Sequence, residues 1–441
     1  MEWELLDGLV AKWVEPDALH GPGVAVAVIQ SGKVIYQQCR GLASLEWSQP
    51  AAPDTVFALA SLTKPFTAQC MLLLEDANKL HLSDSVAPYL PNIPWLDPQI
   101  TIAHLLTHTS GVANYVRQPG FWPEVARRDH TTAELAAHIG GFARDFAPSE
   151  NYSYSNSGYA LLGMLIEAVT GMSYSDYVRA AIFEPLGMRD SRYLSDAAVI
   201  PRRANGYERA TGNAEGTPYE RAPFLSHTVV YASGALGSTL NDLIRWDAAL
   251  REGQFLPEGV DARMTTPLML NDGRRLGYGL GWGLSTYRGH AVAHHAGGVP
   301  GFSTLYVRFP GDDFSLIILS NLGGFDAGGL AAAIANHALD LPEPVVQPTQ
   351  APPEQLEAAA GVYTNPNGER LEVVRLGERL ALRGADTGML TPVGNHTFAL
   401  TESLDTTVRF EALASDGRFT RALVTKPFYW YVVERDSEKL A

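Results

Sequence analysis

The sequence predicts an α+β protein. Its first part combines an antiparallel sheet with flanking helices, and its last part is a small antiparallel barrel or sandwich. Three observations predict this fold class. A β-hairpin pattern at 24–37 and a β-rich stretch at 276–320 lie on either side of a mainly helical region. The proline-rich stretch 343–353 then interrupts all periodicity. From residue 354 onward, short alternating runs are separated by turn residues, as in small antiparallel β-domains.

The helices follow from apolar periodicity and from start and stop signals. Gly111 and Gly171 follow two such periodic runs and are expected to end them, and Pro185 ends a third. Asp242 lies in the first turn of a further helix. The predicted helices are 2–15, one beginning near Ser61, 100–111, 131–147, 160–170, 173–183, one opening at Ser238 or Thr239, and 328–339.

The strands follow from two-residue alternation between turn residues. Ser31, Gly32 and Lys33 are expected to form the turn of the N-terminal hairpin. The segment 196–230 has few periodic signals and is expected to form loops over a cleft. The predicted strands are 24–30, 34–37, 278–282, 291–295, 303–309 and 315–320, and then 361–363, 371–376, 380–383, 389–392, 397–400, 408–413, 422–425 and 429–434.

The length of 441 residues favours more than one domain. We predict a first domain at 1–342, with a helical subdomain at about 65–215. A linker at 343–353 and a second domain at 354–441 follow.

Composition excludes several classes of function. A hydrophobic content of 46% with 18% charged residues is typical of a globular protein, and the net charge of −15 argues against nucleic acid or an anionic membrane as partner. Cys39 and Cys70 are the only cysteines, so neither a disulfide framework nor a thiolate metal cluster is expected. We expect no metal and no cofactor. The N-terminal residues lack the pattern of a signal peptide, and no apolar run approaches membrane-spanning length, so we expect a cytoplasmic protein.

The most informative stretch contains Ser61 three residues before Lys64, at the expected start of a helix. This spacing places both side chains on one helix face. Pro65 fits only near a helix start, where free N–H groups also favour an oxyanion. A neutral amine beside a serine hydroxyl can accept its proton. Ser61 and Lys64 are therefore a candidate nucleophile and base, although a helix cap followed by a solvated lysine explains the stretch equally simply.

Lysine usage favours the catalytic interpretation. The chain has six lysines, and every other cationic side chain is an arginine, which does not deprotonate in proteins. Surface charge is evidently supplied by arginine, so a lysine at this position is informative. The six are Lys12, Lys33, Lys64, Lys79, Lys426 and Lys439.

Two further motifs follow in chain order, Tyr154-Ser155-Asn156 and His295-Ala296-Gly297. With Ser61-Leu62-Thr63-Lys64 they resemble the three-part signature of the serine β-lactamase and penicillin-binding-protein superfamily: S-x-x-K, then Y-x-N or S-x-N, then K-T-G or a variant. The tyrosine is similar to that of the class C branch, with its family VIII esterases and D-aminopeptidases. By themselves, Tyr154 and Asn156 could be turn and cap residues, and His295 a polar strand residue.

The resemblance implies a β-lactamase/transpeptidase-like fold and a site for acyl transfer. Ser61 is expected to attack the substrate and form an acyl-enzyme, while Lys64 and Tyr154 share the proton transfers. We expect each of these two groups to lower the pKa of the other. Asn156 is expected to hydrogen-bond Lys64 and a substrate amide.

The third motif is implied to line the substrate site. The resemblance places the oxyanion donors at the backbone N–H groups of Ser61 and Gly298, the latter on an edge strand. Gly297 and Gly298 have no side chain to block close backbone approach. His295 and Gly297 are expected to bind substrate with them.

One departure from the superfamily pattern concerns charge. No lysine lies between Lys79 and Lys426, so His295 takes the place of a lysine that helps to hold the carboxylate of β-lactams. A histidine is only partly charged near neutrality, so we expect weak or no β-lactamase activity. His104 and His108 lack the neighbouring glutamate of zinc proteases and are interpreted as structural.

The expected function is that of a serine hydrolase acting on small esters or on amides such as D-amino-acid peptides. The alternative is a penicillin-recognising sensor of peptides or other ligands, with slow or no turnover. No G-x-S-x-G motif of an α/β-hydrolase is present. Residues 354–441 resemble the lipocalin-like β-domain of some related peptidases. By analogy this domain is expected to shape access to the cleft or to mediate a homo-oligomer, and the alternative is a passive stabilising domain.

Overall fold

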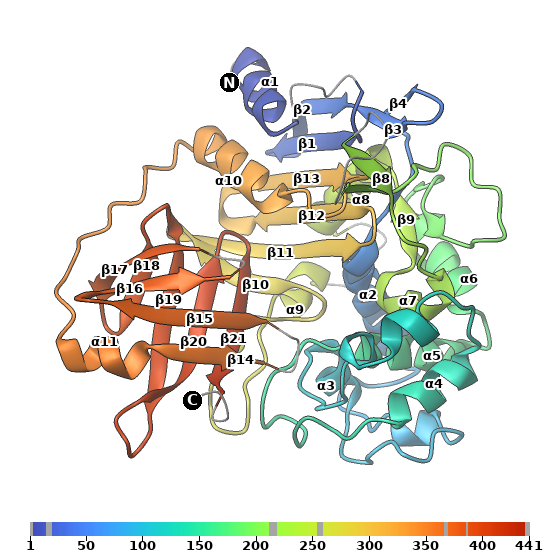
Figure 1. Cartoon of the computed structure of the whole chain (residues 1–441). Helices are drawn as coiled ribbons and strands as arrows, with labels where there is room; N and C mark the ends of the chain where they lie inside the picture. The colour runs from blue at the N-terminus through green and yellow to red at the C-terminus, as the bar shows by residue number, and fades with distance from the viewer. Residues whose placement is uncertain are drawn as a thin grey trace. The chain divides into compact units, whose positions relative to one another are not determined.

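The computed structural model describes residues 3–14, 20–210, 218–253, 259–365, 369–384 and 387–436. The chain divides into two compact units (Figure 1). The first comprises 1–286 and 290–334, and the second comprises 287–289 and 335–441. The domain boundaries expected from the sequence stay a prediction. Among the described residues, no helix combines the length and the apolar character needed to cross a bilayer.

An antiparallel sheet forms the centre of the first unit, with the strand order β10-β11-β12-β13-β1-β2. β1 and β13 pair in the middle of it and are almost entirely buried, because α8 (Leu240–Glu252) packs against both. The turn between β1 and β2 contains only Ser31 and Gly32, both at positive φ, so Lys33 belongs to the strand. The strands are β1 (Val24–Gln30), β2 (Lys33–Arg40), β10 (Gly283–Tyr287), β11 (His290–Val299), β12 (Phe302–Phe309) and β13 (Phe314–Ser320).

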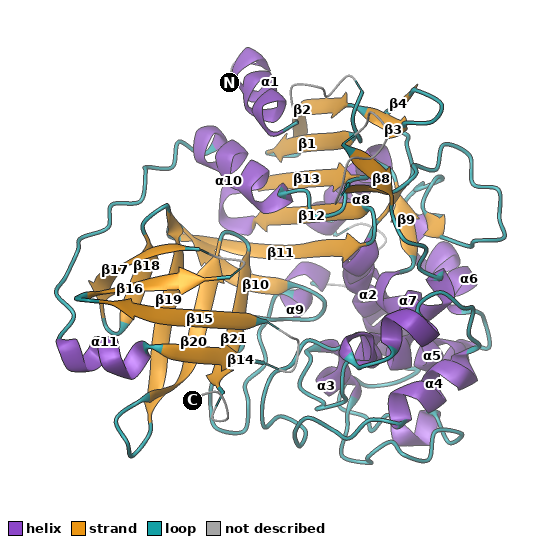
Figure 2. Cartoon of the chain, in the orientation of Figure 1, coloured by secondary structure: helices purple, strands orange, loops and turns teal. Residues whose placement is uncertain are grey.

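Helices of the first unit carry the site. α2, α5 and α7 pack against one another beside the sheet (Figure 2). Short strands connect them to it, with β5 pairing to β9 and β9 to β6. The bounds are α1 (Trp3–Trp13), α2 (Thr63–Asp76), α3 (Ile102–Leu106), α4 (Thr132–Gly140), α5 (Asn156–Thr170), α6 (Tyr174–Val178), α7 (His227–Gly234), α8 (Leu240–Glu252), α9 (Val260–Met264) and α10 (Ala327–Ala338), with β3 (Leu42–Ser44), β4 (Gln49–Pro50), β5 (Phe57–Ala58), β6 (Arg192–Tyr193), β7 (Tyr207–Arg209), β8 (Tyr219–Arg221) and β9 (Leu236–Ser238).

Several predicted boundaries were wrong. α3 ends five residues before Gly111, whose positive φ serves a close approach to the main chain of Phe146 instead. α4 ends at Gly140, where two glycines follow one another, and not at 147. The strand predicted at 278–282 lies at β10, because the chain bends through 279–282. α5 begins at Asn156, inside the expected polar turn, and ends as predicted with Gly171 in the left-handed conformation.

The second unit is a closed antiparallel barrel in which β14 to β21 follow chain order. The barrel predicted from eight alternating runs is confirmed, and each run coincides with a strand. Aromatic side chains fill its interior, among them Tyr363, Phe398 and Phe410. The bounds are β14 (Gly361–Thr364), β15 (Arg370–Leu376), β16 (Arg379–Arg383), β17 (Gly388–Gly394), β18 (Thr397–Leu400), β19 (Ser403–Leu413), β20 (Phe419–Lys426) and β21 (Tyr429–Arg435).

A helix that the sequence analysis missed, α11 (Pro353–Ala359), precedes the barrel. The guanidinium of Arg435 donates hydrogen bonds to the carbonyls of Ala358 and Ala360 at the end of this helix and lies over the ring of Tyr363. Arg435 therefore holds α11 against the barrel by hydrogen bonds to main-chain carbonyls. Because any residue type can supply a carbonyl, this contact could not be predicted from the sequence.

Candidate active site

Ser61 lies in a 3₁₀ turn (Ala60–Leu62) that leads directly into α2, close to the predicted helix start. The preceding Ala60 has φ +50, a left-handed conformation that costs alanine of the order of 1–2 kcal/mol. Its surroundings hold it there: Ala60 is fully buried, and Thr304 on β12 donates a hydrogen bond to the carbonyl of Leu59 at 2.9 Å. The sheet thus fixes the position of the Ser61 hydroxyl.

Lys64 is fully buried and makes three hydrogen bonds through its Nζ. The partners are Ser61 Oγ at 3.1 Å, Asn156 Oδ1 at 2.8 Å and the carbonyl of Ser233 at 2.9 Å. Burial lowers the pKa of Lys64 well below its usual value. A neutral amine has two protons and one lone pair, and the two carbonyl oxygens can only accept protons. The lone pair therefore remains for the hydroxyl of Ser61, as a general base requires.

The carbonyl of Ser233 comes from α7, where the backbone breaks at Tyr231 (φ 38, ψ −132). The break frees two carbonyls for side chains: that of Ala232 accepts from Thr67 Oγ1, and that of Ser233 accepts from Lys64. Gly163 on α5 permits this, since a Cβ there would lie 2.5 Å from both the Tyr231 ring and Ala232. Sequence reasoning missed Ser233 because a main-chain acceptor has no residue signature.

Tyr154 is half-buried, and its ring centre lies 4.7 Å from Lys64 Nζ. Burial raises the pKa of Tyr154 above 10, although a hydrogen bond with Ser61 and the charge of Arg117 oppose the shift. The expectation that each group lowers the pKa of the other was wrong: the pKa of Tyr154 is raised, and the pKa of Lys64 is lowered by burial and not by the tyrosine. Removal from water disfavours the phenolate more than its neighbours stabilise it. Tyr154 is thus a phenol in the resting site and can donate a proton.

His108 packs behind Tyr154, with ring centres 4.3 Å apart. Its Nδ1 accepts a hydrogen bond from the backbone N–H of Ser155, which places the ring proton on Nε2. His104 is bonded separately, to Ser149 through Nε2 and to the backbone N–H of Thr101 through Nδ1. His108 therefore supports the main chain of the second motif, and His104 caps the start of α3, consistent with a structural interpretation of both. Within the described ranges, no group of His, Cys, Asp and Glu side chains could hold a metal ion.

Asn156 is the first residue of α5, and its Oδ1 contacts Lys64. Its Nδ2 and backbone N–H both donate to Asn114 Oδ1, at 3.3 and 3.2 Å. Asn114 therefore orients the Asn156 amide so that the oxygen faces the amine. Sequence reasoning missed Asn114, which lies 42 residues earlier in an irregular segment.

His295 lies on β11 with 5% of its surface exposed. Its Nδ1 is 2.7 Å from the carbonyl of Ala296, which can only accept, so Nδ1 carries the proton and Nε2 accepts from Tyr278 O–H at 3.0 Å. Burial and then the charge of Lys64 lower the pKa of His295 to about 3. The expectation of a partly charged histidine was wrong: the group is neutral near pH 7, because burial outweighs its polar contacts.

Gly297 and Gly298 lie where β11 extends beyond β10, to which it is joined by a two-residue turn. β11 is thus not the edge strand of the sheet, but among the described residues no strand pairs with this half of it on the β10 side. A Cβ on Gly297 would lie closer than 3.0 Å to the carbonyl oxygen of Leu59, whereas one on Gly298 would meet nothing within 4 Å. Gly297 lets the strand pack against the nucleophile turn, and Gly298 leaves open space beside it. The oxyanion donors at Ser61 and Gly298 stay a prediction.

Comparison with known proteins supports the resemblance. The profile of the Beta-lactamase family matches residues 9–339. The chain is 34% identical to penicillin-binding protein 4* of Bacillus subtilis over 313 residues, 67% of each chain, and 28% identical to the D-aminopeptidase of Gluconobacter oxydans over 375 residues, 83% of this chain and 69% of that one. The octameric penicillin-binding protein homologue of Pyrococcus abyssi shares the fold, with a TM-score of 0.67 and 23% identity over 98% of this chain and 100% of that one. The chain belongs to the beta-lactamase family, on the penicillin-binding-protein and class C side, with a C-terminal antiparallel barrel.

Proposed function

We propose that this beta-lactamase-family protein is a serine hydrolase that forms an acyl-enzyme on Ser61 and acts on small esters and on amides of D-amino acids. The observation that carries the proposal is the hydrogen-bond geometry of Lys64. Its Nζ lies 3.1 Å from Ser61 Oγ while Asn156 and Ser233 accept its other protons. A buried neutral amine in this arrangement is a base directed at one hydroxyl.

In acylation, Lys64 Nζ takes the proton of the Ser61 hydroxyl as Oγ attacks the carbonyl carbon. The backbone N–H groups of Ser61 and Gly298 are the proposed donors to the oxyanion that forms. Tyr154 gives its phenolic proton to the leaving nitrogen or oxygen as the bond to the acyl carbon breaks. The proton held by Lys64 then restores the phenol. Deacylation runs through the same groups, with water replacing Ser61 as the attacking nucleophile.

The substrate class follows from charge and from the relatives. His295 is neutral and bonded to Tyr278, so the third motif presents no cation to the carboxylate of a β-lactam. This supports weak or no β-lactamase activity. The 28% identity to a D-aminopeptidase over 83% of this chain supports D-aminoacyl amides or peptides among the substrates.

A labelling experiment tests the proposal. Wild-type protein treated with a fluorophosphonate should gain one adduct on Ser61 by intact mass and peptide mapping, and Ser61→Ala should gain none. A panel of short-chain nitrophenyl esters, D- and L-aminoacyl anilides and a chromogenic cephalosporin then measures kcat/KM. Absence of the adduct, or equal turnover by Ser61→Ala, refutes the proposal. A stable acyl adduct on Ser61 from an ester, an anilide or the cephalosporin, without product turnover, would indicate the sensor instead.

A further inference from the structure

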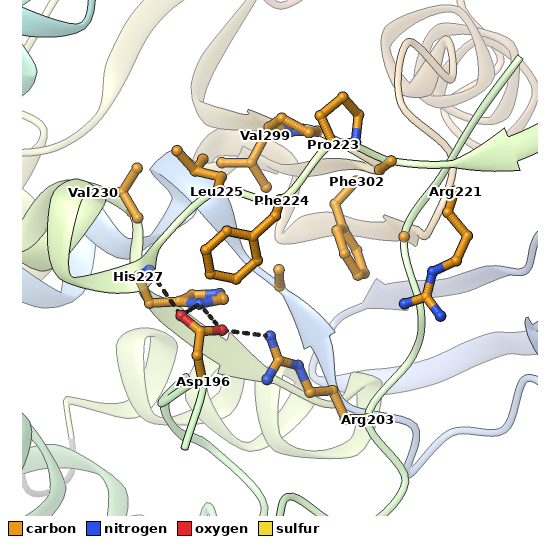
Figure 3. Close-up of a pocket in the computed structure, with 15 residues that line it drawn as sticks. Asp196, Arg203, Arg221, Pro223, Phe224, Leu225, His227, Val230, Val299 and Phe302 are labelled. Carbon is orange, nitrogen blue, oxygen red and sulfur yellow. Dashed lines mark hydrogen bonds and ion pairs between the residues drawn. The ribbon is translucent and has the colours of Figure 1, made fainter. Parts of the chain in front are cut away.

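A pocket is lined largely by residues of 196–206 and 221–230, which belong to the segment that the sequence analysis expected over a cleft (Figure 3). Two of its lining residues adjoin the site directly: Val299 follows Gly298 on β11, and Gly234 follows Ser233 on α7. A Cβ on Gly234 would lie 3.8 Å from the carbonyl carbon of Ala60, the residue before the nucleophile. A group in this pocket and an acyl carbon at Ser61 can therefore belong to one small substrate.

The walls of the pocket are mainly apolar. Val299 and Phe302 pack on a small buried cluster behind them, so that wall is firmly held. Phe224, on the opposite segment, is 51% exposed and lies over the pocket (Figure 3). An aromatic ring of this size left in water beside a nucleophile favours an apolar or aromatic occupant, because covering it stabilises the complex. Leu225 and Val230 extend the same apolar surface.

The imidazole of His227 lines the pocket and is held in a fixed orientation. The carboxylate of Asp196 accepts hydrogen bonds from His227 Nδ1 at 2.8 Å and from the His227 backbone N–H at 3.2 Å, and Arg203 lies 3.6 Å from it (Figure 3). Tyr193 O–H also donates to the carbonyl of His227. With its proton on Nδ1, the imidazole presents Nε2 as an acceptor. No partner of Nε2 occurs in the part of the chain that the structure describes.

Charge decides which occupants fit. Asp196 balances Arg203, and Glu46, 3.3 Å from Arg221, balances the other guanidinium of the pocket. Burial lowers the pKa of His227, although Asp196 opposes the shift, so the imidazole is neutral near pH 7. Both arginines of the pocket thus have a carboxylate partner, and the imidazole carries no charge. The pocket suits a neutral side chain better than a carboxylate or an ammonium group.

We propose that this pocket binds a neutral apolar or aromatic side chain of the substrate, and that His227 Nε2 accepts a hydrogen bond from a donor at the far end of that side chain. A phenolic hydroxyl is such a donor. Asp196 is the positioning residue, because it fixes the tautomer and the ring orientation of His227. This inference rests on the proposed function and names a side-chain preference for it.

The test compares substrates that differ by one hydroxyl. D-Tyrosine p-nitroanilide and D-phenylalanine p-nitroanilide are assayed for kcat/KM with wild type and with His227→Phe. We expect the tyrosyl-to-phenylalanyl ratio to fall roughly 3- to 10-fold in the variant, as for loss of one hydrogen bond. The matched control is His290→Phe, which removes another Asp-paired histidine, bonded to Asp312 at 2.8 Å outside the pocket, and should leave the ratio unchanged.

Two further measurements separate the possible failures. Labelling of Ser61 by a small fluorophosphonate, which does not fill the pocket, should be unchanged in His227→Phe, and its absence in wild type would refute the proposed function itself. Phe224→Ala, at an exposed position, should raise KM for both anilides several-fold more than KM for a nitrophenyl acetate, which does not reach the pocket. The pocket proposal is overturned if the tyrosyl-to-phenylalanyl ratio is unchanged in active His227→Phe. It is also overturned if the KM values of Phe224→Ala for the two anilides equal those of wild type. The pocket proposal is likewise overturned if the wild-type protein hydrolyses acetate esters but neither anilide.

Discussion

Replacing Asn156 by aspartate tests the role of Lys64 directly. The change places a negative charge 2.8 Å from Nζ in nearly the same shape as the amide. Two unit charges at this separation attract by about 1.5 kcal/mol at the dielectric constant of water and by about 6 kcal/mol at an effective value of 20. The attraction stabilises the ammonium form, so it raises the pKa of Lys64 by about 1 to 4 units. The base is then active only at higher pH.

The assay is the pH dependence of kcat/KM for a short-chain nitrophenyl ester, which reports the pKa values of the free enzyme. Asn156→Asp should move the acid limb to higher pH by about 1 to 4 units and leave the activity largely intact above it. Asn114 Nδ2, buried without a partner among the described residues, can donate to the new carboxylate after an amide flip, although the flip removes the acceptor of the backbone N–H of residue 156.

The matched control is Asn241→Asp on α8, where Asn241 Oδ1 accepts from Gln37 of β2 in a partly buried contact that includes none of the reacting groups. This variant adds the same charge and should leave the acid limb in place. An acid limb that stays within a few tenths of a pH unit in folded, active Asn156→Asp would show that Lys64 is not the base.

Three further predictions concern stability. Gly297→Ala, which would press on the carbonyl of Leu59, should lower the free energy of unfolding by about 1–3 kcal/mol, whereas Gly298→Ala should leave it unchanged in thermal unfolding. His295, with a pKa of about 3 when folded and a usual value of 6.5, is protonated earlier in the unfolded chain, so stability should fall as the pH drops from 6.5 towards 3. In urea titrations, His295→Gln should reduce that slope by about 1.4 kcal/mol per pH unit. Arg435→Met should lower the stability of the barrel by about 2–4 kcal/mol, measured by hydrogen exchange of its strands, because charged hydrogen bonds to α11 are lost.

Local patterns predicted the barrel and most helices well. Two-residue alternation identified every strand from β14 to β21, since side chains of such strands point alternately into an apolar interior and outward. Prediction was poorer where the local signal was weak. β10 was placed too early because the apolar residues before it form bends, and α11 was missed because it follows a proline-rich stretch.

In the site, the sequence predicted which side chains meet better than it predicted how deeply they are buried and how they ionise. The spacing of Ser61 and Lys64 brought the two side chains within hydrogen-bond distance, as expected for neighbours on one helix face. The ionisation of Tyr154 and His295 was predicted wrongly, because burial dominates both pKa values and burial depends on segments distant in the chain.

By itself, the sequence determined the family, the α+β class, the barrel and the identity of the side chains that meet around Ser61. These depend on periodicity and on motifs whose members are single residues. Only the tertiary structure decided that the carbonyl of Ser233 is the third partner of Lys64, and that Asn114 orients the Asn156 amide towards it. The physical reason is that a main-chain acceptor has no residue identity, and that the lone pair of an amine is directed only by the partners that packing brings to its protons.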